Sequence, residues 1–200
     1  MSEISAAAVR ELRDKTGAGM MDCKKALAES GGDLEKAVDY LRTKGLAGAA
    51  KKSGRATQEG VIYAYIHPGS KVGVLLEVNC ESDFVARTTD FVELCKDLAM
   101  QVAAANPASV RREDFDPALL ERELAIFRAQ AAESGKPPPI VEKMMQGRVE
   151  KLYKERVLLE QPFVKDPDTS VEDRIKTAIA KLGENIVMRR FVRYQLGEEA

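Results

Sequence analysis

The sequence predicts an α+β fold: a helical N-terminal module, then a helix-rich core with one small antiparallel sheet of three strands. Most of the chain has apolar residues at helical spacing, interrupted by glycine and proline. Three segments are instead rich in β-branched and aromatic residues: GVIYAYIH (60–67), VGVLLEVN (72–79) and IVMRRFVRYQL (186–196). PGSK joins the first two as a hairpin, and the third completes the sheet.

Residues 1–46 predict three short helices. Ser5 is placed to cap the first, and Gly17 suits its left-handed end. Asp33 is placed to cap the third, which we expect to end at Gly45. Helices of this size bury little surface, so residues 1–46 form a small domain. The small, polar and basic residues 47–59 then predict a linker of partly helical character, and residues 60–200 predict the α+β core.

Four further helices are predicted within the core. Phe91, Leu94, Leu98 and Val102 form one apolar stripe of the first. The last opens with a predicted capping box that begins at Thr169. Segment QPFVKDPD (161–168) is expected to be irregular. The predicted helices span 88–105, 116–136, 137–158 and 169–185.

The composition narrows the classes of function. The chain has 200 residues, 44% of them hydrophobic, and a net charge of −1, so no strong field favours nucleic acid or an anionic membrane. No apolar run reaches the roughly 18 residues of a membrane span, and the N-terminus has no signal-peptide pattern. Three cysteines without CxxC spacing indicate reduced thiols. We therefore expect a cytoplasmic protein.

Motifs for catalysis are missing from the sequence. His67 is the sole histidine, beside Pro68 at the hairpin tip, and no GxSxG motif accompanies it. No glycine-rich phosphate loop of the type GxxxxGK[ST] or GxGxxG is present. The carboxylates are spread along helix faces. We expect no enzyme activity, no cofactor and no metal site, and a hydrolase using His67 is the weakest alternative.

Two short segments suggest protein contacts. Met20 and Met21 are adjacent at a helix entry, where both cannot point into a small core. Either the pair belongs to a protein-contact surface, or one methionine lies in the core and the other is incidentally exposed, and the sequence favours the two equally. Asp83 and Phe84 follow a strand, before the apolar stripe of the next helix. Phe84 is either an interface anchor held at a turn or a cover for the core edge, with Asp83 as a turn cap.

Long segments of the chain resemble the elongation factor Ts family. VRELRDKTGAGMMDCKKALAESGGDLEKAVDYLR is similar to its N-terminal signature, and GVIYAYIHPGSKVGVLLEVNCESDFVAR to its second one. Ser82 stands where the family usually has threonine, which keeps the hydroxyl. SGKPPPIVEKMMQGRVEKLYKE, LLEQPFVKDP and GENIVMRRFVRYQLGE also match, so the resemblance covers nearly the whole chain.

The resemblance implies nucleotide exchange on elongation factor Tu, with residues 1–46 as a ubiquitin-associated-like domain that docks on the partner. Phe84 would enter an apolar pocket of the partner, so that Mg²⁺ and then GDP are released. The implied exchange residues are Ser82, Asp83, Phe84 and Val85, the implied docking residues are Arg13, Met20, Met21 and Lys24, and the implied secondary contacts are Leu182 and Gly183. A binding adaptor that uses only the N-terminal module is the main alternative.

A homodimer that engages two copies of elongation factor Tu is also expected. Longer members of the family have two similar halves in the core, whereas this chain has one hairpin and one closing strand. Both faces of the first strand are apolar, so its own helices leave either Val61, Tyr63 and Tyr65 or Ile62, Ala64 and Ile66 uncovered. A second copy related by a two-fold axis would cover that face.

Overall fold

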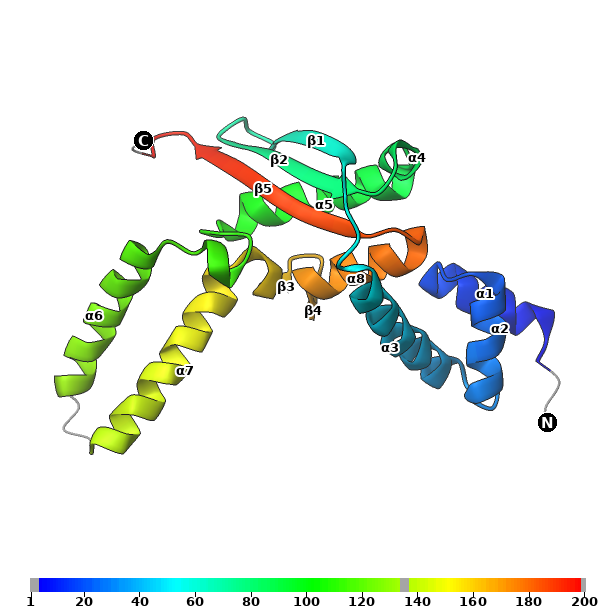
Figure 1. Cartoon of the computed structure of the whole chain (residues 1–200), viewed down its shortest axis with the longest axis horizontal. Coiled ribbons are helices and arrows are strands. Elements are labelled where there is room, and N and C mark those ends of the chain that lie inside the picture. The colour runs from blue at the N-terminus through cyan, green and yellow to red at the C-terminus, as the bar shows by residue number, and fades with distance from the viewer. Residues whose placement is uncertain (1–3, 134–136, 199–200) are drawn as a thin grey trace. The chain divides into compact units, whose positions relative to one another are not determined.

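The structure is a computed structural model that describes residues 4–133 and 137–198 (Figure 1). Its helices and its small three-stranded sheet confirm the predicted α+β class. The chain divides into two compact units. The first takes Met1–Val61, Val78–Leu94 and Asp173–Val187, and the second takes Ile62–Glu77, Cys95–Glu172 and Met188–Ala200.

The antiparallel sheet contains β1 (Glu59–Ile66), β2 (Val72–Cys80) and β5 (Ile186–Gln195), in the order β1-β2-β5. The predicted hairpin is confirmed, because the His67 N–H donates to the Val72 carbonyl oxygen at 2.9 Å. The closing strand is confirmed as well, and beyond it the Leu196 N–H donates to the Lys71 oxygen at 2.8 Å. Gly60, the second residue of β1, has a φ of 152°, and a Cβ there would lie 2.2 Å from the Val78 oxygen, so only glycine fits.

The N-terminal helices are α1 (Ala6–Thr16), α2 (Met20–Glu29) and α3 (Leu34–Lys52). The predicted caps are confirmed: the Ser5 hydroxyl accepts from the Ala8 N–H, Asp33 accepts from the Lys36 N–H, and Gly17 has a φ of 66°. That backbone hydrogen bond lowers the pKa of the Asp33 carboxyl. The small core of these helices consists of Val9, Leu12, Cys23, Ala26, Leu27 and Ala37.

The predicted end of the third helix was wrong. Helix α3 continues past Gly45 to Lys52, so residues 47–52 of the predicted linker are helical. Gly45 is not a helix stop: a Cβ there would lie 3.2 Å from the Cβ of Ala180, so the glycine permits a close approach to α8. The ubiquitin-associated-like character of residues 1–46 and the division at 47–59 and 60–200 stay predictions.

The core helices are α5 (Thr89–Ala105), α6 (Pro117–Glu133), α7 (Pro138–Arg156) and α8 (Val171–Leu182). The predicted stripe of α5 is fully buried. In the second unit the C-terminal part of α5 lies against one face of the sheet (Figure 1), where the Arg193 guanidinium donates to the Ala103 oxygen at 3.3 Å. Residues 134–136, which the sequence placed at the end of the α6 segment, lie outside the described residues.

The expectation of irregular structure at 161–168 was wrong. Two short strands, β3 (Pro162–Phe163) and β4 (Asp166–Ser170), form an antiparallel pair. Buried Gln101 of α5 donates to the Pro162 oxygen and accepts from the Val164 N–H, a long-range support that local sequence does not reveal. Thr169 belongs to β4, its hydroxyl donates to Asp166, and α8 begins only at Val171, so the capping box predicted from Thr169 was also wrong.

Candidate functional site

The chain leaves β2 at Cys80 and forms a one-turn helix, α4 (Asp83–Ala86). Ser82 is its N-cap: its backbone is extended and its hydroxyl accepts from the Val85 N–H at 3.4 Å. We call residues 80–86 the exchange loop, because it contains all four residues of the predicted exchange motif. Its backbone turns immediately after a buried strand end, so the side chains of α4 start from a fixed position.

The structure rules out one of the two interpretations of Phe84. Phe84 is 82% exposed, so it does not cover the core edge. Asp83 is the first helical residue and forms an ion pair with Arg87 at 2.9 Å, so the suggestion that it caps the turn was wrong; Ser82 does so. Val85 is half-buried and Ala86 is buried. The inner side of α4 therefore packs inward, and the phenyl ring of Phe84 points into solvent.

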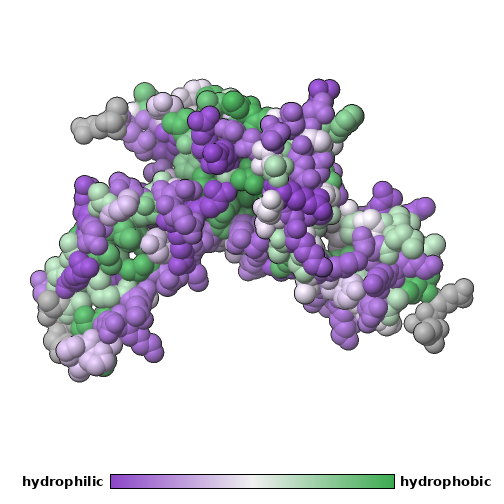
Figure 2. Space-filling model, in the orientation of Figure 1, coloured by the Kyte–Doolittle hydropathy of each residue, from purple (hydrophilic) through white to green (hydrophobic). Residues whose placement is uncertain are grey.

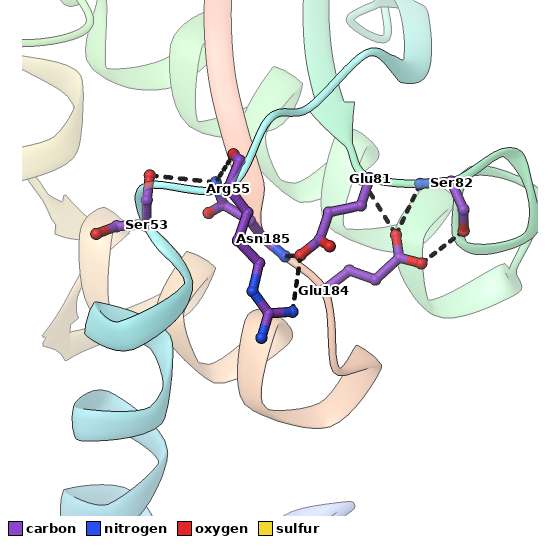
Figure 3. A network of polar contacts seen from close by, with 6 residues as sticks. All are labelled: Ser53, Arg55, Glu81, Ser82, Glu184 and Asn185. Carbon is purple, nitrogen blue, oxygen red and sulfur yellow. Dashed lines mark hydrogen bonds and ion pairs between the residues drawn. The ribbon is translucent and has the colours of Figure 1, made fainter.

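A carboxylate from the turn after α8 holds the start of the exchange loop (Figure 3). Glu184 accepts hydrogen bonds from the Glu81 N–H at 3.1 Å and the Ser82 N–H at 2.9 Å through one oxygen. Its other oxygen accepts from the Ser82 hydroxyl at 2.5 Å. Hydrogen bonds to an ionised carboxylate are stronger than those between neutral groups, so this is a firm attachment.

A second carboxylate makes the return connection. Glu81 accepts from the Asn185 N–H at 2.6 Å and lies 3.4 Å from an Arg55 guanidinium nitrogen. The Asn185 side chain is 2% exposed, and its amide nitrogen donates to the Ser53 oxygen at 3.3 Å and the Arg55 oxygen at 2.9 Å (Figure 3). The exchange loop, the turn after α8 and the segment after α3 thus form one polar network.

The predicted secondary contacts lie beside this network. Leu182 is the last residue of α8 and is half-buried. Gly183 has a φ of 82°, and its N–H donates to the Ile179 oxygen at 3.0 Å, so it ends the helix. The next residue, Glu184, is the one that bonds to the exchange loop. Sequence reasoning missed Glu81, Glu184 and Asn185, because the sequence around a polar residue in a turn does not indicate which distant turn that residue binds.

Cys80 lies at the base of the exchange loop. Burial, together with the negative charge of Glu184, raises the pKa of its thiol to about 11. The thiol is therefore uncharged near neutral pH and is a poor nucleophile. All three cysteines are buried and none forms a disulfide.

The predicted docking residues lie on the first two helices. Met20 is 45% exposed and Met21 is 78% exposed, so neither is part of the small core, to which α2 contributes Cys23, Ala26 and Leu27. Arg13 and Lys24 are also exposed. These four side chains are therefore available for contact with another molecule.

The structure also describes the groups considered for other chemistry. His67 is exposed, and its Nδ1 lies 3.0 Å from the Tyr65 hydroxyl on the same hairpin. Within residues 4–133 and 137–198, no group of three or more histidine, cysteine or acidic side chains is arranged to hold a metal ion. No helix of the described part of the chain is long and apolar enough to cross a membrane.

Comparison with known proteins gives a consistent family assignment. A family model described as elongation factor TS matches residues 49–198. The elongation factor Ts of Desulforamulus reducens is 61% identical over 198 residues, which cover 99% of this chain and 91% of that protein. That of Syntrophomonas wolfei is 59% identical, covering 98% and 91%. That of Moorella thermoacetica is 60% identical, covering 98% and 96%.

Proposed function

This chain belongs to the elongation factor Ts family of translation elongation factors, and from that premise we propose that it binds GDP-bound elongation factor Tu and promotes release of the nucleotide. The observation that best supports the proposal is Phe84, an aromatic ring 82% exposed on a turn that a polar network holds in place. Leaving a phenyl ring in water is unfavourable, and a fixed, exposed aromatic is the usual form of an interface anchor.

The proposed mechanism is mechanical rather than chemical. Phe84 enters an apolar pocket of elongation factor Tu, and the intrusion shifts the elements that hold Mg²⁺ and the phosphates of GDP. Asp83 and Val85 contact the partner beside the ring. GDP then loses its metal bridge and leaves. Such a step requires no acid, base, cofactor or metal on this chain, so we propose an exchange factor without catalytic groups of its own.

The thermodynamic requirement is a difference in affinity. The factor must bind nucleotide-free elongation factor Tu more tightly than the GDP-bound form. By reciprocity, a bound nucleotide then weakens the affinity of elongation factor Tu for the factor by the same ratio, so nucleotide binding releases the factor at the end of the cycle. We propose that exposed Arg13, Met20, Met21 and Lys24 dock on the partner, while Leu182 and Gly183 make contacts close to the exchange loop.

We further propose a homodimer that binds two copies of elongation factor Tu. Of the two faces that the sequence left open, the one with Ile62, Ala64 and Ile66 is exposed, and Ile62 is 67% exposed. Leu75, Val192 and Tyr194 extend this apolar sheet face across β2 and β5. Figure 2 shows hydrophobic residues gathered over β1 and β2. Each large residue left in water forgoes roughly 1.5–3 kcal/mol, which a second copy would recover.

Release of fluorescent GDP from elongation factor Tu tests the proposal. We expect the protein to accelerate release at substoichiometric concentration, because an exchange factor is regenerated. The N-terminal adaptor hypothesis predicts binding without release, and predicts that a Phe84→Ala protein behaves as wild type. A His67→Ala control should release GDP at the wild-type rate. Unchanged GDP release in the presence of the wild-type protein would refute the proposal. Since the proposed partner acts in translation, we expect a cytoplasmic location.

A further inference from the structure

We infer that Glu184 is a positioning residue for Phe84, that is, that it fixes the exchange loop in the conformation that presents the ring. The inference rests on the proposed function. It concerns a residue outside the motif that the sequence singled out, and Figure 3 shows how its carboxylate lies against Glu81 and Ser82.

The exchange loop needs support from outside. Helix α4 has four residues, and helices this short are not stable by themselves. Phe84, being 82% exposed, gains little from packing on its own chain. Of the residues of α4, Ala86 is the buried one. The orientation of the ring therefore depends on the groups that fix the backbone before it.

Glu184 fixes that backbone at two successive peptide groups. Both the Glu81 N–H and the Ser82 N–H point at one carboxylate oxygen, at 3.1 and 2.9 Å. Two donors converging on one atom restrict the dihedral angles between them. The backbone of Glu81, which lies between the two N–H groups, is thereby held, and Ser82 follows in an extended conformation, φ −131° and ψ 155°, from which α4 starts.

Glu184 also orients the group that caps α4. The Ser82 hydroxyl has one hydrogen, which it donates to Glu184 at 2.5 Å. Its lone pairs are then free to accept from the Val85 N–H, at 3.4 Å. Without Glu184 the hydroxyl could rotate and donate elsewhere. One carboxylate thus acts on residue 85 through residue 82, on both sides of Phe84.

Glu184 is itself held in place. Its neighbour Asn185 is buried, donates from its side chain to the Ser53 and Arg55 oxygens, and donates its N–H to Glu81. Each of the two acidic residues therefore accepts a backbone N–H from the other segment. Such a reciprocal arrangement holds both turns at once, as precise positioning of a functional group requires.

The test compares Glu184→Ala with wild type in saturating GDP-release assays. Misplacement of a working group by about 1 Å can cost on the order of a hundredfold in rate. We expect the maximal rate of GDP release to fall about tenfold or more, while the concentration giving half-maximal release changes less than about threefold, because docking uses α1 and α2. Glu184→Gln, which keeps an acceptor oxygen, should fall in between.

The matched control is Glu150→Ala. Glu150 accepts two hydrogen bonds from Arg112, at 3.0 and 2.7 Å, and lies in the second unit. Its loss should leave GDP release unchanged. A second comparison adds Glu184→Ala to Phe84→Ala. If Glu184 acts through Phe84, the double variant releases GDP no more slowly than Phe84→Ala alone. The inference would be overturned if the two changes act independently, so that the rate with the double variant is reduced by the product of the two single reductions.

A measurement on the free protein separates this inference from the proposed function. Hydrogen exchange of the Ser82 and Val85 amides should accelerate at least tenfold in Glu184→Ala, with the amides of α5 unaffected. Unchanged exchange at both amides would overturn the inference, whatever elongation factor Tu does. If the wild-type protein does not accelerate GDP release from elongation factor Tu, the proposed function is refuted but the inference about Glu184 is not. If Glu184→Ala does not fold, Glu184→Gln gives the same comparison.

Discussion

Replacement of Phe84 by alanine isolates the contribution of one exposed ring. Burying a phenylalanine side chain completely is worth about 1.5–3 kcal/mol. Because 82% of Phe84 is still exposed in the free protein, about 1.2–2.5 kcal/mol remains to be gained in a partner pocket. If the whole of this contact forms only as GDP is expelled, its loss slows GDP release roughly 8- to 70-fold.

The same exposure predicts that Phe84→Ala hardly affects folding. The contrast is Phe91→Ala, seven positions along the chain, whose ring is fully buried. That change should cost about 3–5 kcal/mol of the free energy of unfolding. Urea titration and GDP release therefore separate the two phenylalanines: one change lowers the exchange rate, the other lowers stability.

A surface control is available in Ile126→Ala, which removes an exposed apolar side chain of α6. We expect wild-type GDP release and stability for that protein. A folded Phe84→Ala protein that releases GDP within twofold of wild type would refute the idea that the ring works in the partner. A large loss of stability in Phe84→Ala would refute the structural reasoning instead.

Three further predictions concern other parts of the molecule. The double change Met20→Ala and Met21→Ala should weaken binding of elongation factor Tu about tenfold, mainly through faster dissociation in surface plasmon resonance, with the helical circular dichroism unchanged; wild-type dissociation would show that these methionines are idle. Light scattering in reducing buffer should give about twice the 22.0 kDa chain mass, and Ile62→Lys should shift the mass toward one chain; a wild-type mass of one chain would contradict the dimer. The free energy of unfolding should fall as the pH rises from 9 to 11, because the pKa of Cys80 is raised to about 11 in the folded protein. In this range the thiol ionises in the unfolded chain while it is still protonated in the folded one. A Cys80→Ala protein with the same pH profile would contradict this prediction.

The fold could be predicted because its signals are local. Ser5, Gly17 and Asp33 act on backbone groups within a few residues, so the sequence locates the ends of α1 and the start of α3. The apolar stripe of α5 depends on a short period, and the strands β1 and β2 are recognised from their own β-branched and aromatic residues. The strand β5 is recognisable from its β-branched and aromatic residues, although its partner lies more than a hundred residues away.

The errors arose where a distant contact changed the meaning of a residue. Gly45 resembles a helix stop until Ala180 is seen against it. The pair β3 and β4 depends on buried Gln101. For the candidate site, the place of Phe84 before the α5 stripe singled out the residue but left open whether it is exposed or covers the core edge. Nothing near Glu184 in the sequence shows that it binds Ser82, 102 positions away. Carboxylates in turns are usually solvated, so position in space, not residue type, distinguishes this one.

The continuity of α3 has a consequence for how the docking region proposed on α1 and α2 and the exchange loop would act together on one partner. A flexible tether would let the docking helices and the exchange loop find the partner independently, at an effective concentration set by chain statistics. Here α3 runs unbroken to Lys52, and the residues that follow are fastened to Asn185. The connection is therefore a stiff spacer, and its length is set by the rise of the helix, about 1.5 Å per residue. Adding one residue within α3 would also rotate the docking helices by about 100°, so helical phase, rather than reach, sets whether both regions can engage one partner.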